Sequence, residues 1–337
     1  MYQLDSKSEK LIGKMIKGRK FIKLNVGLII GDQIILKTFN ENGEIDYENN
    51  IYEIGSITKT FTASLLSKYI HENKMKLDDS LQKYISELDL DRHYPSLRHL
   101  ATHTAGYKAN SITTRESLEL LKDTVIGYGN TSLKNPLNMD FNEMVGIIQN
   151  YHLKNKDYKW KYSNIGFSFL GYALGAASGY GYHNIMEDFI KNELELKNTF
   201  LGTINGKNLK GFNSKNEDCG NWKWENNLYA PAGAISSTTD DLLEYAKSNM
   251  HEEKPYFALC HQKHASISKN FDMGLGWMQT LFRKSNNRIL WHSGGTGCFL
   301  TFMGFNKEKK IASVVLSNYK LFSVQRLGLL ILENIKI

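Results

Sequence analysis

Four serines in this chain are followed three residues later by a lysine, a spacing that can build a nucleophile. On a helix, residues i and i+3 share one face, so the lysine amine can lie beside the serine hydroxyl and assist its deprotonation. A serine at a helix N-terminus also faces the positive end of the helix dipole, which favours a developing oxyanion. The spacing alone is weak evidence, because at least three of the four pairs arise by chance. The pairs are Ser56/Lys59, Ser80/Lys83, Ser266/Lys269 and Ser317/Lys320.

Sequence context selects the first pair. Ser56 follows a glycine, and apolar residues recur at helical spacing from Phe61 to Tyr69, which places Ser56 at the start of a buried helix with Lys59 one turn in. Ser80 follows two aspartates, and helix N-capping is its simpler role. Ser266 is expected in a polar linker, and Ser317 is expected at the end of a strand. Ser56 is therefore the predicted nucleophile.

A serine–lysine pair needs a further proton carrier and a donor that holds the substrate, and a Tyr-x-Asn motif can supply both. Tyr162 and Asn164 lead directly into a predicted helix at residues 165–177, which Trp160 anchors. A tyrosine at a rigid helix entry is better placed for catalysis than one on a mobile loop. Three further copies of the motif are expected in loops without apolar support. They are Tyr47/Asn49, Tyr128/Asn130 and Tyr182/Asn184.

A third element is the glycine-rich stretch WHSGGTG. His292 ends a predicted strand, and the glycines at 294, 295 and 297 permit close backbone approach before the next strand begins. Taken alone, this stretch favours a glycine hairpin whose histidine is structural.

Several other catalytic signatures are absent from the sequence. It contains no Gly-x-Ser-x-Gly elbow, no His-Glu-x-x-His, no Walker A loop and no Gly-x-Gly-x-x-Gly. The nearest metal-like cluster combines Cys260, His261 and His264 in a predicted polar linker, without a second ligand group nearby. We therefore expect neither a metal nor another cofactor.

The overall composition is that of an ordinary soluble globular protein. The chain has 337 residues, 41% hydrophobic and 23% charged, and a formal net charge of +7. Its lysines are spread over the whole length, so a nucleic-acid partner is not expected. No segment approaches the ~18 apolar residues of a membrane span.

Cysteine usage and the N-terminus predict a compartment. Cys219, Cys260 and Cys298 form an odd set without Cys-x-x-Cys spacing, so free thiols in a reducing compartment are expected. The first residues lack the apolar core of a secretory signal, which favours a cytoplasmic location unless a presequence was removed. An amphipathic, lysine-rich segment at residues 10–17 is interpreted as a terminal helix packed on a sheet rather than a membrane-surface anchor.

Strand-like runs at both ends of the chain enclose a mostly helical block. Strands are predicted at 23–30, 33–39, 275–282, 288–292, 299–305 and 311–316, and helices at 58–70, 141–151, 165–177, 238–248 and 324–335. This order predicts an α+β fold: an antiparallel sheet built from both chain termini and flanked by helices, with an inserted all-helical lobe. We expect a single domain with an α/β lobe at about 1–55 and 255–337, a helical lobe at about 56–254, and a site between them.

Together these elements resemble the serine β-lactamase and penicillin-binding protein superfamily, specifically its class C-like branch of β-lactamases, D,D-peptidases, D-aminopeptidases and esterases. Each motif is short, but five in series over nearly the whole chain make a chance match very improbable. The β-lactamase/transpeptidase-like fold also agrees with the strand–helix–strand order. The matching stretches are YEIGSITKTFTAS at 52–64, LRHLATHTAGY at 97–107, residues 160–174, APAGAISSTTDDL at 230–242, and residues 292–318.

The resemblance implies roles on the helical side of the site. Ser56 matches the acylated nucleophile, Lys59 the amine that assists its deprotonation, and Tyr162 the tyrosine that relays protons. Asn164 matches the side chain that binds the lysine and the substrate amide. A cationic Lys59 would lower the pKa of Tyr162 from its usual value near 10 and make it a base. Whether Lys59 or Tyr162 accepts the serine proton stays open.

On the strand side, the resemblance assigns His292, Ser293 and Gly294 to the family's Lys-Thr-Gly strand. The backbone amides of Ser56 and Gly295 would form the oxyanion hole. His292 stands where efficient β-lactamases have a lysine, so a fixed charge for a substrate carboxylate becomes a group expected to titrate near pH 6.5. This replacement lowers the expectation of strong penicillinase activity.

The predicted function is a serine hydrolase that forms an acyl-enzyme on Ser56 with a small amide, short-peptide or ester substrate. A true class C-like β-lactamase acting on β-lactams is an alternative. So is a non-catalytic descendant that binds a peptide or cell-wall fragment, or forms an assembly. His103, in the Thr-His-Thr-Ala-Gly turn, is interpreted as structural. The natural substrate and the oligomeric state stay open.

Overall fold

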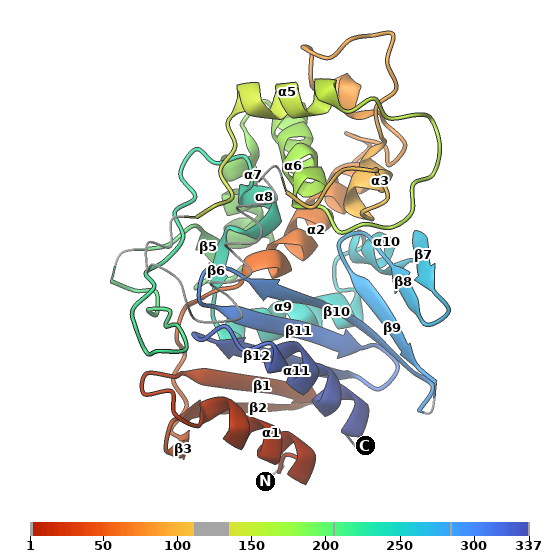
Figure 1. Ribbon diagram of the computed structural model, residues 1–337. Coiled ribbons are helices and arrows are strands. Elements are labelled where there is room, and N and C mark those ends of the chain that lie inside the picture. The colour runs from red at the N-terminus through yellow and green to blue at the C-terminus, as the bar shows by residue number, and fades with distance from the viewer. Residues whose placement is uncertain (1–2, 111–134, 205, 284, 336–337) are drawn as a thin grey trace.

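A nine-stranded antiparallel sheet, drawn in the lower half of Figure 1, is the largest element of the fold. The computed structural model describes residues 3–110, 135–204, 206–283 and 285–335. The strand order is β3-β2-β1-β12-β11-β10-β9-β8-β7, so the two ends of the chain meet where β1 pairs with β12. This confirms the predicted α+β class. The strands are β1 (Leu24–Ile30), β2 (Gln33–Asn40), β3 (Gly43–Ile45), β7 (Ala265–Ser268), β8 (Phe271–Met273), β9 (Met278–Phe282), β10 (Asn287–Gly295), β11 (Leu300–Asn306) and β12 (Ile311–Ser317).

Helices cover both faces of the centre of this sheet. Because successive side chains of a strand point to opposite faces, β12 contributes to two separate cores. Val314 belongs to the core shared with α9 (Thr239–His251), and Val315 belongs to the core shared with α1 (Ser6–Ile16) and α11 (Ser323–Asn334). Both faces of β12 are therefore buried.

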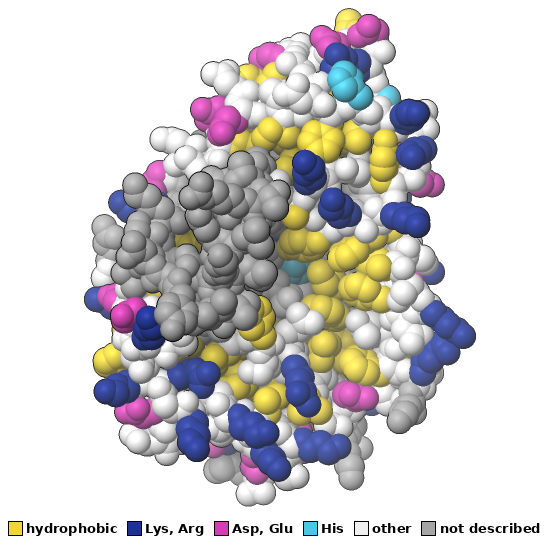
Figure 2. Space-filling model, in the orientation of Figure 1, with side chains coloured by type: hydrophobic (Ala, Val, Ile, Leu, Met, Phe, Trp, Pro, Cys, Tyr) yellow, Lys and Arg dark blue, Asp and Glu magenta, His cyan; other side chains and the backbone are white. Residues whose placement is uncertain are grey.

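The basic N-terminal helix packs as the sequence predicts. Asp5 caps α1 by accepting hydrogen bonds from the backbone amides of Lys7 and Ser8. Ile12 and Met15 are buried in the core beneath the helix. No helix within the described residues is long and apolar enough to cross a membrane. On the face in Figure 2, Lys and Arg side chains are spread mainly along the lower and right-hand edges.

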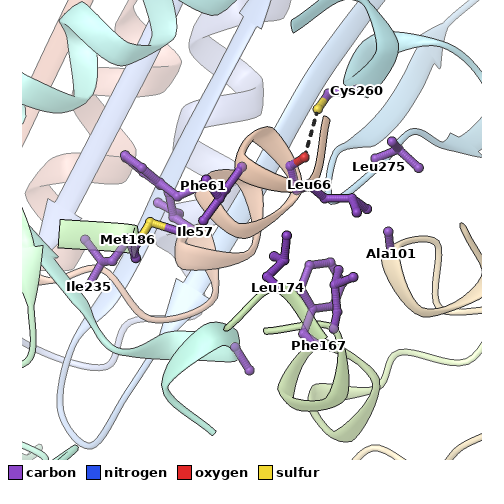
Figure 3. Packing of buried hydrophobic residues seen from close by; sticks show 14 of the residues in the cluster. Ile57, Phe61, Leu66, Ala101, Phe167, Leu174, Met186, Ile235, Cys260 and Leu275 are labelled. Atoms are coloured by element: carbon purple, nitrogen blue, oxygen red, sulfur yellow. Dashed lines mark hydrogen bonds between the residues drawn. The ribbon is translucent and has the colours of Figure 1, made fainter. Parts of the chain in front are cut away.

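The upper part of the molecule in Figure 1 is built around α2 (Thr58–His71) and α6 (Asn164–Ser178). Most of α2 is buried on every side, and Phe61 and Leu66 pack in the same core as Phe167 and Leu174 of α6 (Figure 3). A helix enclosed in this way gives its side chains fixed positions. The further helices are α3 (Leu97–Ala101), α5 (Phe141–Asn150), α7 (Tyr182–Asp188), α8 (Ala230–Gly233) and α10 (Phe257–His261), with short turns of other helix types at Gly55–Ile57, Leu81–Tyr84 and Phe189–Glu193.

A small second sheet joins the chain just before Ser56 to the segment after α8. It consists of β4 (Tyr52–Glu53), β6 (Ile235–Ser237) and β5 (Phe200–Leu201), in the order β4-β6-β5. The Ile54 amide donates to the Ile235 carbonyl at 2.9 Å and extends the pairing to within two residues of Ser56. The division into two lobes, with limits near 55 and 255, stays a prediction.

The segment predicted as a polar linker near residue 260 is ordered structure instead. It forms α10 and then β7, because Phe257 and Cys260 are buried against α2. The Cys260 thiol donates to the Ala63 carbonyl oxygen at 3.4 Å. The dashed line from Cys260 in Figure 3 marks this bond. Within the described residues, no group of three His, Cys, Asp or Glu side chains could hold a metal ion.

The expectation of three free cysteines is wrong. Cys219 and Cys298 form a disulfide across 79 residues, and only Cys260 is a free, buried thiol. Local spacing could not reveal this pair, because the fold brings the loop between β5 and α8 against the turn between β10 and β11. Disulfides persist mainly in oxidising compartments. The thiol argument for a cytoplasmic location therefore no longer holds, and the compartment stays a prediction.

Candidate active site

Ser56 lies at the entrance to the buried helix α2. A single tight turn, Gly55–Ile57, runs directly into the helix, so the serine faces its N-terminal end. Gly55 has φ +53°, a left-handed conformation that glycine adopts without steric cost. Ser56 itself is partly exposed, while both its neighbours are buried. The hydroxyl is thus held on rigid backbone and remains open to a ligand.

Lys59 is fully buried one turn into α2, and its amine has three oxygen neighbours. The Nζ atom lies 3.0 Å from Ser56 Oγ, 2.7 Å from Asn164 Oδ1 and 2.6 Å from the Ala232 carbonyl oxygen. Ala232 belongs to α8, so three helices fix the position of this amine. The predicted proximity of Ser56, Lys59 and Asn164 is therefore present in the structure.

Burial lowers the pKa of Lys59 well below its usual value. In its neutral form, which burial favours, the amine carries two hydrogens and one lone pair. The Asn164 Oδ1 and Ala232 carbonyl oxygens can only accept, so they take the two hydrogens. The lone pair is then left for the hydroxyl proton of Ser56.

Tyr162 and Asn164 stand at the N-terminus of α6. Ser163 is the helix N-cap, and its hydroxyl accepts from the Gly166 amide at 3.0 Å. The Lys59 amine lies 4.9 Å from the centre of the Tyr162 ring. The structure therefore brings the phenol into the same cluster as the predicted serine and lysine.

The electrostatic expectation for Tyr162 is wrong. Burial raises its pKa, and a hydrogen bond with Ser56 opposes that rise only in part. The expected lowering required a cationic lysine, whereas burial disfavours the charged forms of both groups. Tyr162 therefore stays protonated near neutral pH and is suited to give a proton rather than to remove one.

The C-terminal end of β10 passes directly beside the turn that carries Ser56. A Cβ atom built on Gly55 would lie 2.5 Å from the Gly295 amide nitrogen, and one built on Gly294 would lie 1.8 Å from the Ile54 carbonyl oxygen. Only glycine permits this approach. The amides of Ser56 and Gly295, predicted to form an oxyanion hole, are thereby brought close together.

Replacing Gly294 with alanine is expected to lower kcat/KM roughly 100-fold or more, the scale for loss of one oxyanion donor. The new methyl group would push β10 away from Ile54 and displace the Gly295 amide. Gly295→Ala is the matched control, because its Cβ would meet first the flexible end of Leu300 at 3.0 Å. Steady-state hydrolysis of a nitrophenyl ester by both variants checks the prediction; equal losses would contradict it.

His292 is buried in the structure, and its titration near pH 6.5 is not supported. Burial, and secondarily the charge of Lys59, lowers the pKa of His292 to about 3. Its Nδ1 lies 2.6 Å from the Ser293 carbonyl oxygen. The imidazole is therefore neutral throughout the physiological range. The Ser293 hydroxyl donates to Gln325 Oε1 at 3.1 Å.

The other Ser-x-x-Lys pairs have different partners. The Ser80 hydroxyl caps a short helical turn, as predicted, and Lys83 pairs with Asp79. The hydroxyls of Ser266 and Ser317 bond to Asp272 Oδ1 and to the Tyr319 carbonyl oxygen respectively.

Two of the other Tyr-x-Asn copies, Tyr47/Asn49 and Tyr182/Asn184, lie outside the cluster around Ser56. Tyr182 begins α7 rather than lying in a loop, and its hydroxyl bonds to Thr62 at 2.7 Å. Tyr47 bonds to Asp240. Tyr128 and Asn130 lie outside the described residues.

Three site contacts could not be found from the sequence. They are the Ala232 carbonyl on Lys59, the Gln325 side chain on Ser293, and Asn110, whose Oδ1 accepts from Asn164 Nδ2 at 2.6 Å. The first uses a backbone atom, which any residue could supply. The other two come from polar residues without a local motif. Only the fold places them.

The chain is similar in sequence to several known proteins. The chain is 23% identical over 281 residues to Protein flp of Staphylococcus aureus (strain MW2), matching 79% of this chain and 52% of that protein. It thus spans about half of that relative's length. It is 27% identical over 242 residues to a β-lactamase of Pseudomonas fluorescens, matching 68% of this chain and 60% of that one.

Solved structures share the fold at low sequence identity. A β-lactamase/D-alanine carboxypeptidase from Pseudomonas syringae superposes with a TM-score of 0.79 at 16% identity, covering 98% of both chains. A D-stereospecific amidohydrolase from Streptomyces sp. superposes with a TM-score of 0.72 at 18% identity, covering 92% of this chain and 94% of that one. The sequence model of one family, Beta-lactamase, matches residues 12–333. Since that match spans nearly the whole chain, the protein belongs to the Beta-lactamase family.

Proposed function

We propose that this protein is a serine hydrolase that forms an acyl-enzyme on Ser56 with a small ester, amide or short-peptide substrate. The observation that carries the proposal is the buried Lys59 amine, 3.0 Å from Ser56 Oγ and hydrogen-bonded to two acceptors. That arrangement supplies a base at the serine without a histidine.

In the proposed acylation, the Ser56 proton passes to the Lys59 lone pair while Oγ bonds to the acyl carbon. The carbonyl electron pair moves onto the oxygen, which the amides of Ser56 and Gly295 stabilise. The intermediate collapses when the bond to the leaving group breaks. The leaving oxygen or nitrogen takes a proton from the Tyr162 phenol, and Lys59 returns its proton to the tyrosine.

Deacylation repeats these transfers with water in place of the serine. Water gives a proton to Lys59 and attacks the ester carbon. When the bond to Ser56 Oγ breaks, Oγ takes a proton from the Tyr162 phenol, Lys59 returns its proton to the tyrosine, and the acid product leaves. Asn164 is proposed to orient the lysine, because its Oδ1 accepts from Lys59. Its Nδ2 donates one hydrogen to Asn110, and the second hydrogen is proposed to hold the acyl group. No step calls for a metal or an organic cofactor.

The substrate class follows from the charge at the end of β10. His292 is neutral and buried, so it offers no fixed cation for a substrate carboxylate. Uncharged acyl groups are therefore the preferred substrates in our proposal. True β-lactamase activity remains the second candidate, because a β-lactamase of Pseudomonas fluorescens is among the relatives and class C β-lactamases share the fold.

Replacing His292 with lysine is expected to shift selectivity toward carboxylate-bearing substrates. A charge-assisted hydrogen bond contributes about 1.5–3 kcal/mol, so the ratio of kcat/KM for an acid substrate to that for its methyl ester should rise roughly 10- to 100-fold. His292→Gln, which stays neutral, is the control. An unchanged ratio in the lysine variant would refute this role for the position.

Two measurements test the proposed function. A fluorophosphonate should phosphonylate Ser56: a bond forms between Oγ and phosphorus, fluoride leaves, and peptide mass spectrometry locates the adduct. A nitrophenyl ester should then be hydrolysed faster than a chromogenic cephalosporin. Lactam turnover far above ester turnover would favour the β-lactamase. Absence of any Ser56 adduct would favour a binding protein without catalysis.

A further inference from the structure

The segment that carries Tyr162 is tied to the stretch 103–110 on both sides of the tyrosine. The Lys161 amide donates to the His103 carbonyl oxygen at 2.9 Å. The Ser163 amide donates to His103 Nδ1 at 3.1 Å. One residue, His103, therefore holds both neighbours of Tyr162, through its backbone on one side and its ring on the other.

The His103 ring also packs against the phenol itself. Its centre lies 4.5 Å from that of Tyr162 and 5.1 Å from that of Phe167 on α6. His103 is 1% exposed, and its Nε2 makes no hydrogen bond with any residue the structure describes. Because Nδ1 accepts, the single proton of the neutral ring is on Nε2.

The backbone at His103 adopts a conformation that most side chains avoid. Its φ is +60°, in the left-handed region, which among non-glycine residues asparagine, aspartate and histidine adopt most often. Strained backbone of this kind persists where the surrounding structure requires it, and it gathers at functional sites. Here the turn directs one side chain back onto the entry to α6.

We propose that His103 is a positioning residue that acts through Tyr162. By bonding to Lys161 and Ser163, the residues on either side of Tyr162, it holds the Tyr162 phenol beside Ser56. This inference rests on the proposed function and goes beyond it, because His103 belongs to none of the groups assigned to proton transfer or substrate binding. A displacement of about 1 Å in such a group can cost about 100-fold in rate.

Two substitutions distinguish the role of the Nδ1 acceptor of His103 from that of its left-handed backbone. Asparagine and glycine both tolerate a left-handed backbone, and both remove the imidazole ring. Only asparagine retains an acceptor near the position of Nδ1. We expect His103→Gly to lower kcat/KM about 100-fold, mainly through kcat, and His103→Asn to recover most of that loss.

A double-mutant cycle with Tyr162→Phe is the decisive experiment. If His103 acts through the phenol, adding His103→Gly or His103→Asn to the Tyr162→Phe variant should change its rate less than about threefold. The proposal would be overturned if a substitution at 103 lowered the rate equally in the unaltered protein and in Tyr162→Phe. It would also be overturned if His103→Asn and His103→Gly had indistinguishable rates. Thermal melting of each variant accompanies the kinetics.

Fluorophosphonate labelling keeps this outcome separate from the proposed function. Absence of a Ser56 adduct in the unaltered protein would remove the hydrolase proposal itself. An adduct together with additive losses would overturn only the role of His103. Should the glycine variant fail to fold, the asparagine variant still decides: a rate within about tenfold of the unaltered protein supports the clamp, and a loss as large as that of Tyr162→Phe contradicts it.

Discussion

Replacing Ser56 with alanine is expected to lower kcat roughly a millionfold, the scale seen when a serine hydrolase loses its nucleophile. The fold should remain intact, because the Lys59 amine keeps its other two acceptors, Asn164 Oδ1 and the Ala232 carbonyl oxygen, when the hydroxyl is removed. Ester hydrolysis by the purified variant, followed together with its melting temperature, checks both parts of the expectation.

Ser80→Ala is the matched control for this experiment. It removes a hydroxyl from a second Ser-x-x-Lys pair, but that hydroxyl caps a helical turn and its lysine pairs with Asp79. We expect a small loss of stability and unchanged turnover. Appreciable residual hydrolysis in Ser56→Ala, above the rate of a heat-denatured sample, would mean that another group is the nucleophile.

Replacing Lys59 with methionine is expected to lower kcat/KM about 100- to 10,000-fold, the range for loss of a general base. Methionine has a similar volume and suits a buried position, so the fold should persist. The unaltered protein should also gain activity as pH rises through the lowered pKa of Lys59, well below 10.5, because only the neutral amine accepts a proton. The methionine variant should lose that rise.

Tyr162→Phe is the comparison that assigns the base. Burial raises the pKa of the phenol, so its removal should slow the reaction while leaving the acid side of the pH profile in place. Should the rise with pH disappear in Tyr162→Phe and persist in Lys59→Met, the tyrosine would be the base and our assignment would be wrong. The pH dependence of kcat/KM for each variant gives the answer.

Local patterns were sufficient to find the helical half of the site. Ser56 and Lys59 are three residues apart on one helix, and Tyr162 and Asn164 are two apart at the start of another, so each pair depends only on short-range geometry. Strand and helix limits followed from apolar periodicity in the same way. β12, predicted at 311–316, lies at Ile311–Ser317.

Contacts between distant segments were not predictable. The disulfide joins Cys219 to Cys298 across two loops that share no pattern. The stretch from Cys260 to Ser266 is predicted to be a polar linker, although Cys260 is buried and packs against α2. Both errors have one cause: the partners lie far apart in sequence, and composition within a short window carries no information about them.

The amino-acid sequence by itself determined which side chains are the candidates for the chemistry and the family to which the chain belongs, because helix spacing and short motifs are local properties. The tertiary structure alone decided their protonation. Burial lowers the pKa values of Lys59 and His292 and raises that of Tyr162, because the surrounding chain removes water from all three. Desolvation is a property of the packed molecule, and no local stretch of sequence contains it.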